Sequence, residues 1–309
     1  MLRYSLKRLL VAIPTILALI VIAFFLMRLA PGGPFTAERP LPESVMKNVL
    51  ARYGMDQPLY VQFGTYLKNL FFHFDFGPSF AQKDRSVNEI IAHGFPVTIT
   101  YGFWSAVFVL LLGIPLGIIA ALRHNGVWDY TMTGLAIFSQ IFPNFVLAPL
   151  MVLLFTLVLG WLPGGGWNGG QWQYIIMPAV ALGTSYMASV ARLTRGQMLE
   201  VLNSPFIRTA RAKGLSERTI VWRHAMKPAL LPVVSYMGPV FVYMITGSVF
   251  IDVFFSTGGI GQDFIDGAYS RDYSVLMALA LLYITLTIVL NLLMDLIYAW
   301  VDPKVRSAL

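Results

Sequence analysis

The sequence of 309 residues contains no cysteine, which excludes disulfides, thiol chemistry and cysteine-ligated metals. Charged residues are scarce as well, at 12% of the chain against about 25% in soluble domains. Hydrophobic residues make up 57%. This combination predicts an integral membrane protein that crosses the bilayer several times.

Histidine is also scarce. The four copies, at positions 73, 93, 124 and 224, fall in separate segments and form no His-x-x-x-His pair and no metal cluster. The sequence also lacks a Gly-x-Ser-x-Gly motif and a phosphate-binding Gly-x-x-x-x-Gly-Lys-Ser/Thr motif. We therefore expect a chain that is not an enzyme and holds no cofactor or metal. If it moves a solute uphill, the energy comes from another chain or from an ion gradient.

The formal net charge of +7 would suggest a nucleic-acid partner in a soluble protein. In a membrane protein, basic residues accumulate on cytoplasmic loops, and this is the simpler explanation. The basic N-terminus with the apolar run behind it also resembles a signal peptide. However, the run has no small-residue cleavage site and continues to Arg28, which favours an uncleaved first span.

Apolar runs predict six spans, at about residues 9–29, 97–122, within 131–161, 174–191, 229–254 and 275–299. The third run is too long for one straight crossing, and Pro143 and Pro149 are expected to kink it. Between the first two spans, short helices are expected at 43–53, 59–72 and 86–93, with a turn at 73–80.

The distribution of charge orients these spans. Residues 192–227 contain eight Lys or Arg against Glu200 and Glu217, whereas residues 255–273 contain Arg271 against three aspartates. The positive-inside rule therefore predicts that 192–227 is cytoplasmic and that both chain termini are too.

Spans four and five are rich in small and hydroxyl residues, which either pack helices closely or line a polar path. The candidate lining residues are Thr184, Ser185, Ser235, Thr246 and Ser248. The acids nearest the hydrocarbon are Asp252 and Asp295, and each is either functional or paired at a span end. A pairing of Asp295 with Arg192 is one possibility.

The most unusual stretch is basic and lies between spans four and five, at residues 204–232. Ser204 and Pro205 form a helix start, with a hydroxyl cap and a proline at the first helical position. Gly214 is a helix stop, and Ser216 with Glu217 begins a second helix. Two short helices are thus expected to meet at a glycine corner. Such a stretch either only orients the protein or docks a partner.

The segment TARAKGL at 209–215, followed by RHA at 223–225, resembles the cytoplasmic loop of ABC-importer permease subunits, within them the peptide branch. In the wider family this motif begins with Glu-Ala-Ala and keeps a glycine a few residues later. Gly214 matches that glycine and Ala210 matches an alanine. Arg208 and Thr209 occupy the place of the family's glutamate, and the absence of this acid is typical of the peptide branch.

Short matches to the B-type subunits of oligopeptide importers continue along nearly the whole chain: LKRLLVAIPT, RLAPGGPF, YGMDQPLYVQF, DFGPSF, LGIPLGIIAAL, LPGGGWNGG, TGSVFID, GGIGQ and SRDYSV. Where relatives often have Pro-Gly, this chain has Gly258-Gly259. The resemblance implies an all-α type I importer permease fold with six transmembrane helices and cytoplasmic termini. It divides the chain into a cytoplasmic N-terminus with the first helix (1–29), a periplasmic helical segment (30–95), a five-helix core with a coupling loop at 195–228 (96–302) and a cytoplasmic tail (303–309).

The resemblance also implies the function and the partners. The chain would carry oligopeptides across the bacterial inner membrane by alternating access, together with a C-type permease subunit. Two ATPase subunits would hold the ATP and magnesium, a periplasmic binding protein would deliver the peptide, and no nucleic acid would be involved. Residues expected to dock on an ATPase are Phe206, Thr209, Ala210, Arg211, Lys213, Gly214 and Leu215.

Other cargoes and other classes remain alternatives. Dipeptide, murein-peptide, glutathione and nickel importers share the same framework. A secondary transporter would need discontinuous helices and inverted halves, and would have no use for a docking loop. A membrane enzyme would need a convergent polar site.

Overall fold

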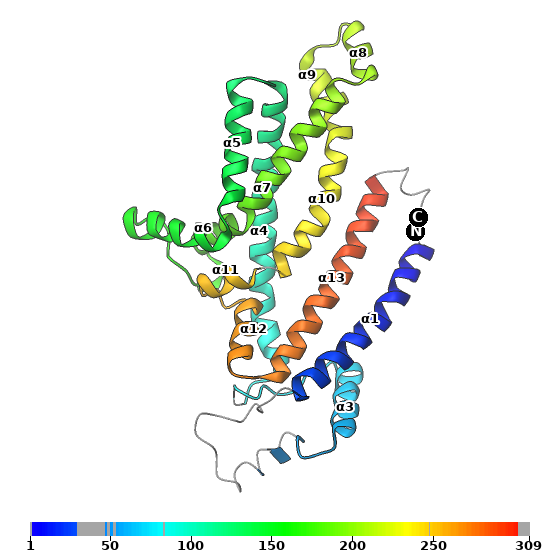
Figure 1. Ribbon diagram of the computed structural model, residues 1–309, viewed down its shortest axis with the longest axis vertical. Coiled ribbons are helices and arrows are strands. Elements are labelled where there is room, and N and C mark those ends of the chain that lie inside the picture. The colour runs from blue at the N-terminus through cyan, green and yellow to red at the C-terminus, as the bar shows by residue number, and fades with distance from the viewer. Residues whose placement is uncertain are drawn as a thin grey trace.

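The computed structural model describes residues 2–29, 47, 50, 51, 54–82, 84–246 and 248–301, and these residues are almost entirely helical. Five long helices form the body: α1 (Leu2–Leu29), α4 (Val87–Leu122), α7 (Trp172–Leu202), α10 (Met226–Thr246) and α13 (Tyr273–Val301). Figure 1 shows them side by side, with α8 at one end and α12 near the other. We call these the α8 end and the α12 end.

The third predicted span is broken. Helix α5 (Val127–Ile141) is followed by α6 (Asn144–Met151) and the π-helical η2 (Val152–Val158), and the two halves are bent by 101°. The break falls at Pro143, as predicted, because its φ and missing N–H favour a new helix start there. Pro149 does not break the chain and lies within α6.

By length and composition, five helices of the described chain can cross a membrane, or six if the bent pair counts as one span. This agrees with a polytopic, all-α fold. Helix α1 begins, and α13 ends, on the side of the molecule toward α8 (Figure 1). The sidedness of the termini across the membrane stays a prediction.

Helix α4 corrects one prediction. The expected short helix at 86–93 and the second span are one continuous helix of 36 residues that passes through Pro96. It starts with a capping box, in which the Ser86 hydroxyl accepts from the Glu89 N–H and the Glu89 carboxylate accepts from the Ser86 N–H. The proline removes only one backbone bond, and close packing of Gly94 and Thr98 on α12 supports the helix on both sides.

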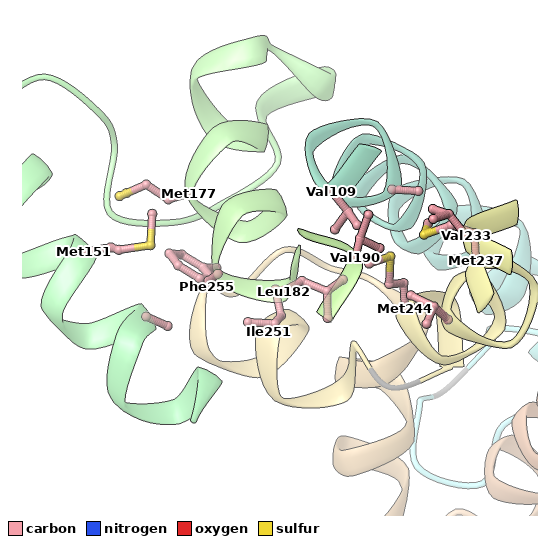
Figure 2. Packing of buried hydrophobic residues seen from close by; sticks show 14 residues of the cluster. Val109, Met151, Met177, Leu182, Val190, Val233, Met237, Met244, Ile251 and Phe255 are labelled. Carbon is pink, nitrogen blue, oxygen red and sulfur yellow. The ribbon is translucent and has the colours of Figure 1, made fainter. Parts of the chain in front are cut away.

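Helices α4 and α7 form the centre of the bundle. They approach so closely that a β-carbon on Gly117 would lie 2.5 Å from the Ala191 carbonyl oxygen, so only glycine fits there. Helix α10 packs along both of them. Figure 2 shows this core, where Val109, Val190 and Met244 gather at one side and Met151, Met177 and Phe255 at the other, with Leu182 and Ile251 between.

Helix α3 (Leu59–Lys68) continues into the π-helical η1 (Asn69–His73), which confirms a helix at 59–72. It packs against α1 through Phe24 and Phe63, whose ring centroids are 5.0 Å apart, and Arg28 Nε donates to Gln62 Oε1 at 2.7 Å. Most of the helix predicted at 43–53 lies outside the described residues.

Two short helices complete the α12 end. Span five stops as α10 at Thr246 and resumes as α11 (Val249–Phe254), and the loop predicted at 255–273 contains α12 (Ile260–Tyr269). Helix α12 packs on the beginnings of α4 and α13 in a cluster that includes Ile90, Ile260 and Leu279.

A buried aspartate ties the segment before α4 to α13. The Asp272 carboxylate accepts hydrogen bonds from the Ser79 hydroxyl, from Phe80 N at 3.0 Å and from Ala81 N at 3.1 Å. Its other oxygen accepts from Val275 N at 3.2 Å, in the first turn of α13. These hydrogen bonds therefore attach the segment that follows η1 to the first turn of α13.

Candidate functional site

The basic stretch forms a compact corner at the α8 end, which we call the basic corner (residues 204–219). Helix α8 (Pro205–Ala212) begins with Pro205 at the first helical position, as predicted. The predicted hydroxyl cap is wrong, because the Ser204 hydroxyl donates back to the Val201 carbonyl at 2.6 Å. This bond fastens the new helix to the end of α7.

Gly214 ends α8 in the way the sequence indicates. Its φ is +78°, and Leu215 N donates to the Ala210 carbonyl at 3.3 Å while Gly214 N donates to the Arg211 carbonyl at 2.9 Å. This pair of bonds is a Schellman motif, which places glycine at the left-handed position. A β-carbon on Gly214 would meet nothing within 4 Å, so backbone conformation alone selects glycine.

Helix α9 (Glu217–Thr219) follows immediately and continues into the π-helical η4 (Ile220–Ala225) and α10. The Ser216 hydroxyl caps it by accepting from Thr219 N at 3.3 Å, as predicted. Across the corner, Arg211 Nε donates to Glu217 Oε1 at 2.7 Å and Nη2 donates to Oε2 at 3.3 Å. This fork raises the pKa of the Arg211 guanidinium and bridges the two helices on the solvent-exposed side of the corner.

The corner has an inner and an outer face. Ile207 and Ala210 are buried in a cluster with Ile118 of α4, Met198 of α7 and Ala229 of α10. Every displacement of the corner is thus transmitted to three long helices.

The outer face carries the predicted docking residues, with one exception. Phe206 is 49% exposed and Leu215 is 39% exposed, so two large apolar side chains lie on the solvent-facing side of the corner. The other exposed members are Thr209, Arg211, Lys213 and Gly214. Ala210, predicted to share this face, points inward because it lies one turn from Ile207 on the buried stripe of α8.

An ion pair near the corner was not predicted. Arg195 of α7 contacts Asp129 in the first turn of α5, with Nε to Oδ1 at 2.5 Å and Nη2 to Oδ2 at 2.8 Å. His124 Nδ1 and Asn125 N also contact Asp129 Oδ2, at 3.2 and 2.9 Å. In the sequence, Asp129 stands out only as an acid three residues after Gly126 in the first turn of an apolar helix, and no spacing connects it to Arg195.

Four of the predicted path-lining residues, Thr184, Ser185, Ser235 and Thr246, are half-buried. Three of their hydroxyls donate to the backbone carbonyl four residues earlier, which satisfies them within the helix. Ser248 is fully buried and bonds to Asp252, so it lies beneath the surface instead. The side chain of Asp295 lies outside the described part of the chain, and a pairing with Arg192 stays a prediction.

Comparison with protein families gives two matches that together span nearly the whole chain. Residues 113–307 match the binding-protein-dependent transport system inner membrane component family, and residues 1–102 match the N-terminal region of the same class of membrane component.

Among the described residues, no group of three His, Asp or Glu side chains is placed to hold a metal.

Curated relatives align over their full length. The chain is 54% identical to the oligopeptide transport system permease protein OppB of Escherichia coli strain K12 over 306 residues, which is 99% of this chain and 100% of the relative. It is 40% identical to the dipeptide transport system permease protein DppB of Bacillus subtilis, over 99% of this chain and 98% of that one.

Solved structures share the fold. The methionine ABC transporter MetNI, in an inward-facing conformation, matches with a TM-score of 0.60 at 19% identity, over 70% of this chain and 97% of that one. An amino acid ABC transporter crystallised with histidines matches with a TM-score of 0.55 at 15% identity, over 68% and 94%.

Proposed function

The chain belongs to the family of binding-protein-dependent transport inner membrane components, and on that premise we propose that it is a permease subunit of an ATP-driven oligopeptide importer. Its multi-pass helical body, placed in the inner membrane by the family, supplies the path. The similarity to a dipeptide permease makes a shorter peptide the second candidate cargo.

The energy for import comes from other chains in this proposal. Two ATPase subunits bind ATP and magnesium, a second permease subunit of the C type completes the path, and a periplasmic binding protein delivers the peptide. This chain then carries no catalytic group and no cofactor of its own. Its task is to change shape when the ATPases close.

The observation that carries the proposal is the construction of the basic corner. Its outer face presents exposed Phe206 and Leu215 beside the cations Arg211 and Lys213, which suits a protein groove with an apolar floor and an acidic rim. Its inner face is packed into α4, α7 and α10. A push on the corner therefore moves the helices that border the path.

ATP binding to the partner would select between two packings of these helices, one open to each side of the membrane. Such a switch needs rigid coupling, which the Schellman turn and the buried contacts of Ile207 and Ala210 supply. Thr184, Ser185, Ser235 and Thr246 would line the path. The internally bonded hydroxyls of Thr184, Ser235 and Thr246 and the scarcity of charge suit a passage that accepts varied side chains.

Copurification and transport test this function together. The chain is expressed with its partner chains, purified through a tag on this chain, and reconstituted into liposomes with the binding protein outside. We expect ATPase subunits in the purified complex and ATP-dependent uptake of labelled oligopeptide. Purification without an ATPase partner, together with uptake driven by an ion gradient, would instead identify a secondary transporter.

Cargo choice is tested in the same liposomes. Labelled dipeptide, glutathione, murein tripeptide and nickel are each offered with the binding protein present. Oligopeptide uptake should exceed the uptake of each of these by about tenfold or more, since a wide path gives little discrimination and the binding protein sets the preference. Preferential uptake of one of the others would reassign the cargo within the same type of importer.

A further inference from the structure

A closed cluster of hydrogen bonds surrounds Asp252 at the α12 end. The side chain is 0% exposed, and its carboxyl group accepts from four donors. They are the hydroxyls of Thr98, Ser248 and Thr257, at 3.2, 3.2 and 2.8 Å, and the backbone N–H of Gly261 at 3.1 Å. We call these five residues the Asp252 cluster.

The cluster joins segments that are far apart in the sequence. Thr98 belongs to α4, Ser248 and Asp252 to the start of α11, and Gly261 to the first turn of α12. Thr98 has a double role, because its hydroxyl donates to Asp252 and accepts from Ile260 N at 3.0 Å. Two of the N–H groups that begin α12 are therefore satisfied by side chains from α4 and α11.

The same body extends to the turn between η2 and α7. Gly166 N donates to the Phe255 carbonyl at 2.6 Å, at the end of α11. Tyr101, fully buried on α4 one turn from Thr98, directs its hydroxyl to the Gly166 carbonyl at 3.3 Å. Helix α4, the turn at 162–170, α11 and α12 are thus bonded to one another.

All of these bonds lie at the end of the molecule opposite the basic corner (Figure 1). They connect α12 to α4, the helix that also contacts the corner through Ile118. Helix α10 ends at Thr246 and is followed along the chain by α11. Helix α11 carries Asp252 and is held in place by its hydrogen bonds. The Asp252 cluster therefore controls whether a movement of α4 and α10 is transmitted to α12.

We infer that Asp252 is a positioning residue for transport, which holds α11 and α12 on α4 so that the three move as one body when the path switches. The inference rests on the proposed import function. Without the carboxyl group, three hydroxyls and the Gly261 N–H lose their acceptor, and α12 can shift while α4 moves. Peptide would then be lost from the path although ATP is still hydrolysed.

The first test separates coupling from assembly. Asp252→Asn keeps the size of the side chain but turns an N–H₂ group toward donors, and Thr98→Val removes the bonds to Asp252 and Ile260. In the reconstituted complex we expect unchanged subunit recovery and basal ATP hydrolysis. We expect peptide uptake per ATP to fall about tenfold for Asp252→Asn and roughly threefold for Thr98→Val.

A matched control lies two residues away on α4. The Thr100 hydroxyl donates only to the Pro96 carbonyl, within its own helix. Thr100→Val should therefore leave uptake per ATP within about twofold of the wild type, since that bond contributes little. A loss as large as that of Thr98→Val would show a general effect of removing threonine from α4 and would overturn the inference.

The second test is a double-mutant cycle. If Thr98 acts through Asp252, the double variant Asp252→Asn, Thr98→Val should lower uptake per ATP by no more than about twofold beyond Asp252→Asn alone, because the bond between the two side chains is already lost. Independent effects would instead multiply to about thirtyfold.

The outcomes are distinct. Normal uptake per ATP in Asp252→Asn overturns the positioning role. Effects of Asp252→Asn and Thr98→Val that multiply in the double variant also overturn it, because the two side chains would then act independently. Failure of the import function itself would appear as absent uptake in the unmodified complex.

Discussion

Arg195 of α7 and Asp129 of α5, 66 residues apart in the chain, form a two-point ion pair two turns before α7 reaches the basic corner. The Asp129 side chain is 3% exposed and that of Arg195 is 28% exposed. The pair fixes the start of α5, and with it the turn that leaves α4, to the helix that carries the corner. A displacement of the corner therefore moves α5 as well as α4 and α7.

This ion pair predicts a specific pattern of stability. Arg195→Gln removes the full counter-charge from the buried Asp129 carboxylate and should lower the unfolding free energy by about 2 kcal/mol, whereas Asp129→Asn leaves a partly exposed guanidinium and should lower it by less. The double substitution should cost less than the sum of the two. Thermal unfolding of the purified complex measures both quantities. Arg192→Gln, on an exposed position of the same helix, is the control and should change little.

Gly214 predicts a loss of coupling rather than of folding. Gly214→Val forces a β-branched residue into a left-handed conformation, which costs roughly 1–2 kcal/mol locally and distorts the Schellman turn. Membrane insertion should be normal, and stimulation of ATP hydrolysis by peptide and binding protein should be lost. Gly214→Asn is the matched variant, since asparagine tolerates this conformation, and it should retain most of the stimulation. Equal stimulation in the valine and asparagine variants would refute the role of the corner geometry.

Sidedness can be tested with single cysteines. Lys68, exposed on α3, is predicted to face the periplasm, and Lys213, exposed on the basic corner, is predicted to face the cytoplasm. Lys68→Cys should react with an impermeant maleimide in intact cells, and Lys213→Cys only after permeabilisation. The opposite labelling pattern would invert the topology.

Asp263 on α12 predicts a pH dependence of stability. Burial raises the pKa of its carboxyl group to about 6, helped by the negative charge of Asp266 and opposed by Arg85. The folded chain therefore binds a proton that the unfolded chain, with a pKa of 3.8, has released. The contribution of Asp263 to stability is therefore fully present below about pH 4, is lost as the pH rises from 4 to 6, and does not change above that range.

Thermal unfolding between pH 4 and 7 checks this slope. Asp263→Asn removes the titrating group, so the variant should lose the decline between pH 4 and 6 and should be more stable than the wild type above pH 6. Asp266→Asn, at an exposed position one turn away, should keep most of the decline. A slope that survives in Asp263→Asn would assign it to another group.

Local chemistry explains what could be predicted from the sequence. Gly214, Ser216 and Pro143 were placed correctly because turns, caps and proline breaks depend on a few neighbouring residues. The continuous passage of α4 through Pro96 was missed because contacts of Gly94 and Thr98 with α12 support the helix, and those partners lie more than 150 residues away.

The side of a helix on which an individual side chain is buried was harder still to predict. Ala210 and Ser248 were assigned to accessible surfaces, but each lies on the side of its helix that another element covers. Asp129 was not predicted as a site residue because its role depends on its contact with Arg195. No spacing in the sequence indicates that these two residues meet. Pairings across a helical bundle require the tertiary structure.

The length of α4 has a consequence for the setting of the α12 end. A helix of 36 residues is about 54 Å long, whereas the hydrocarbon layer is about 30 Å thick. Its final turn leads into Arg123 and His124, which mark the water boundary at the α8 end. With the predicted orientation, the excess would project at the other end as a stalk, with α12 packed near its tip. The binding protein of the proposed importer would then deliver its cargo onto a raised protein rim and would not need to displace lipid headgroups.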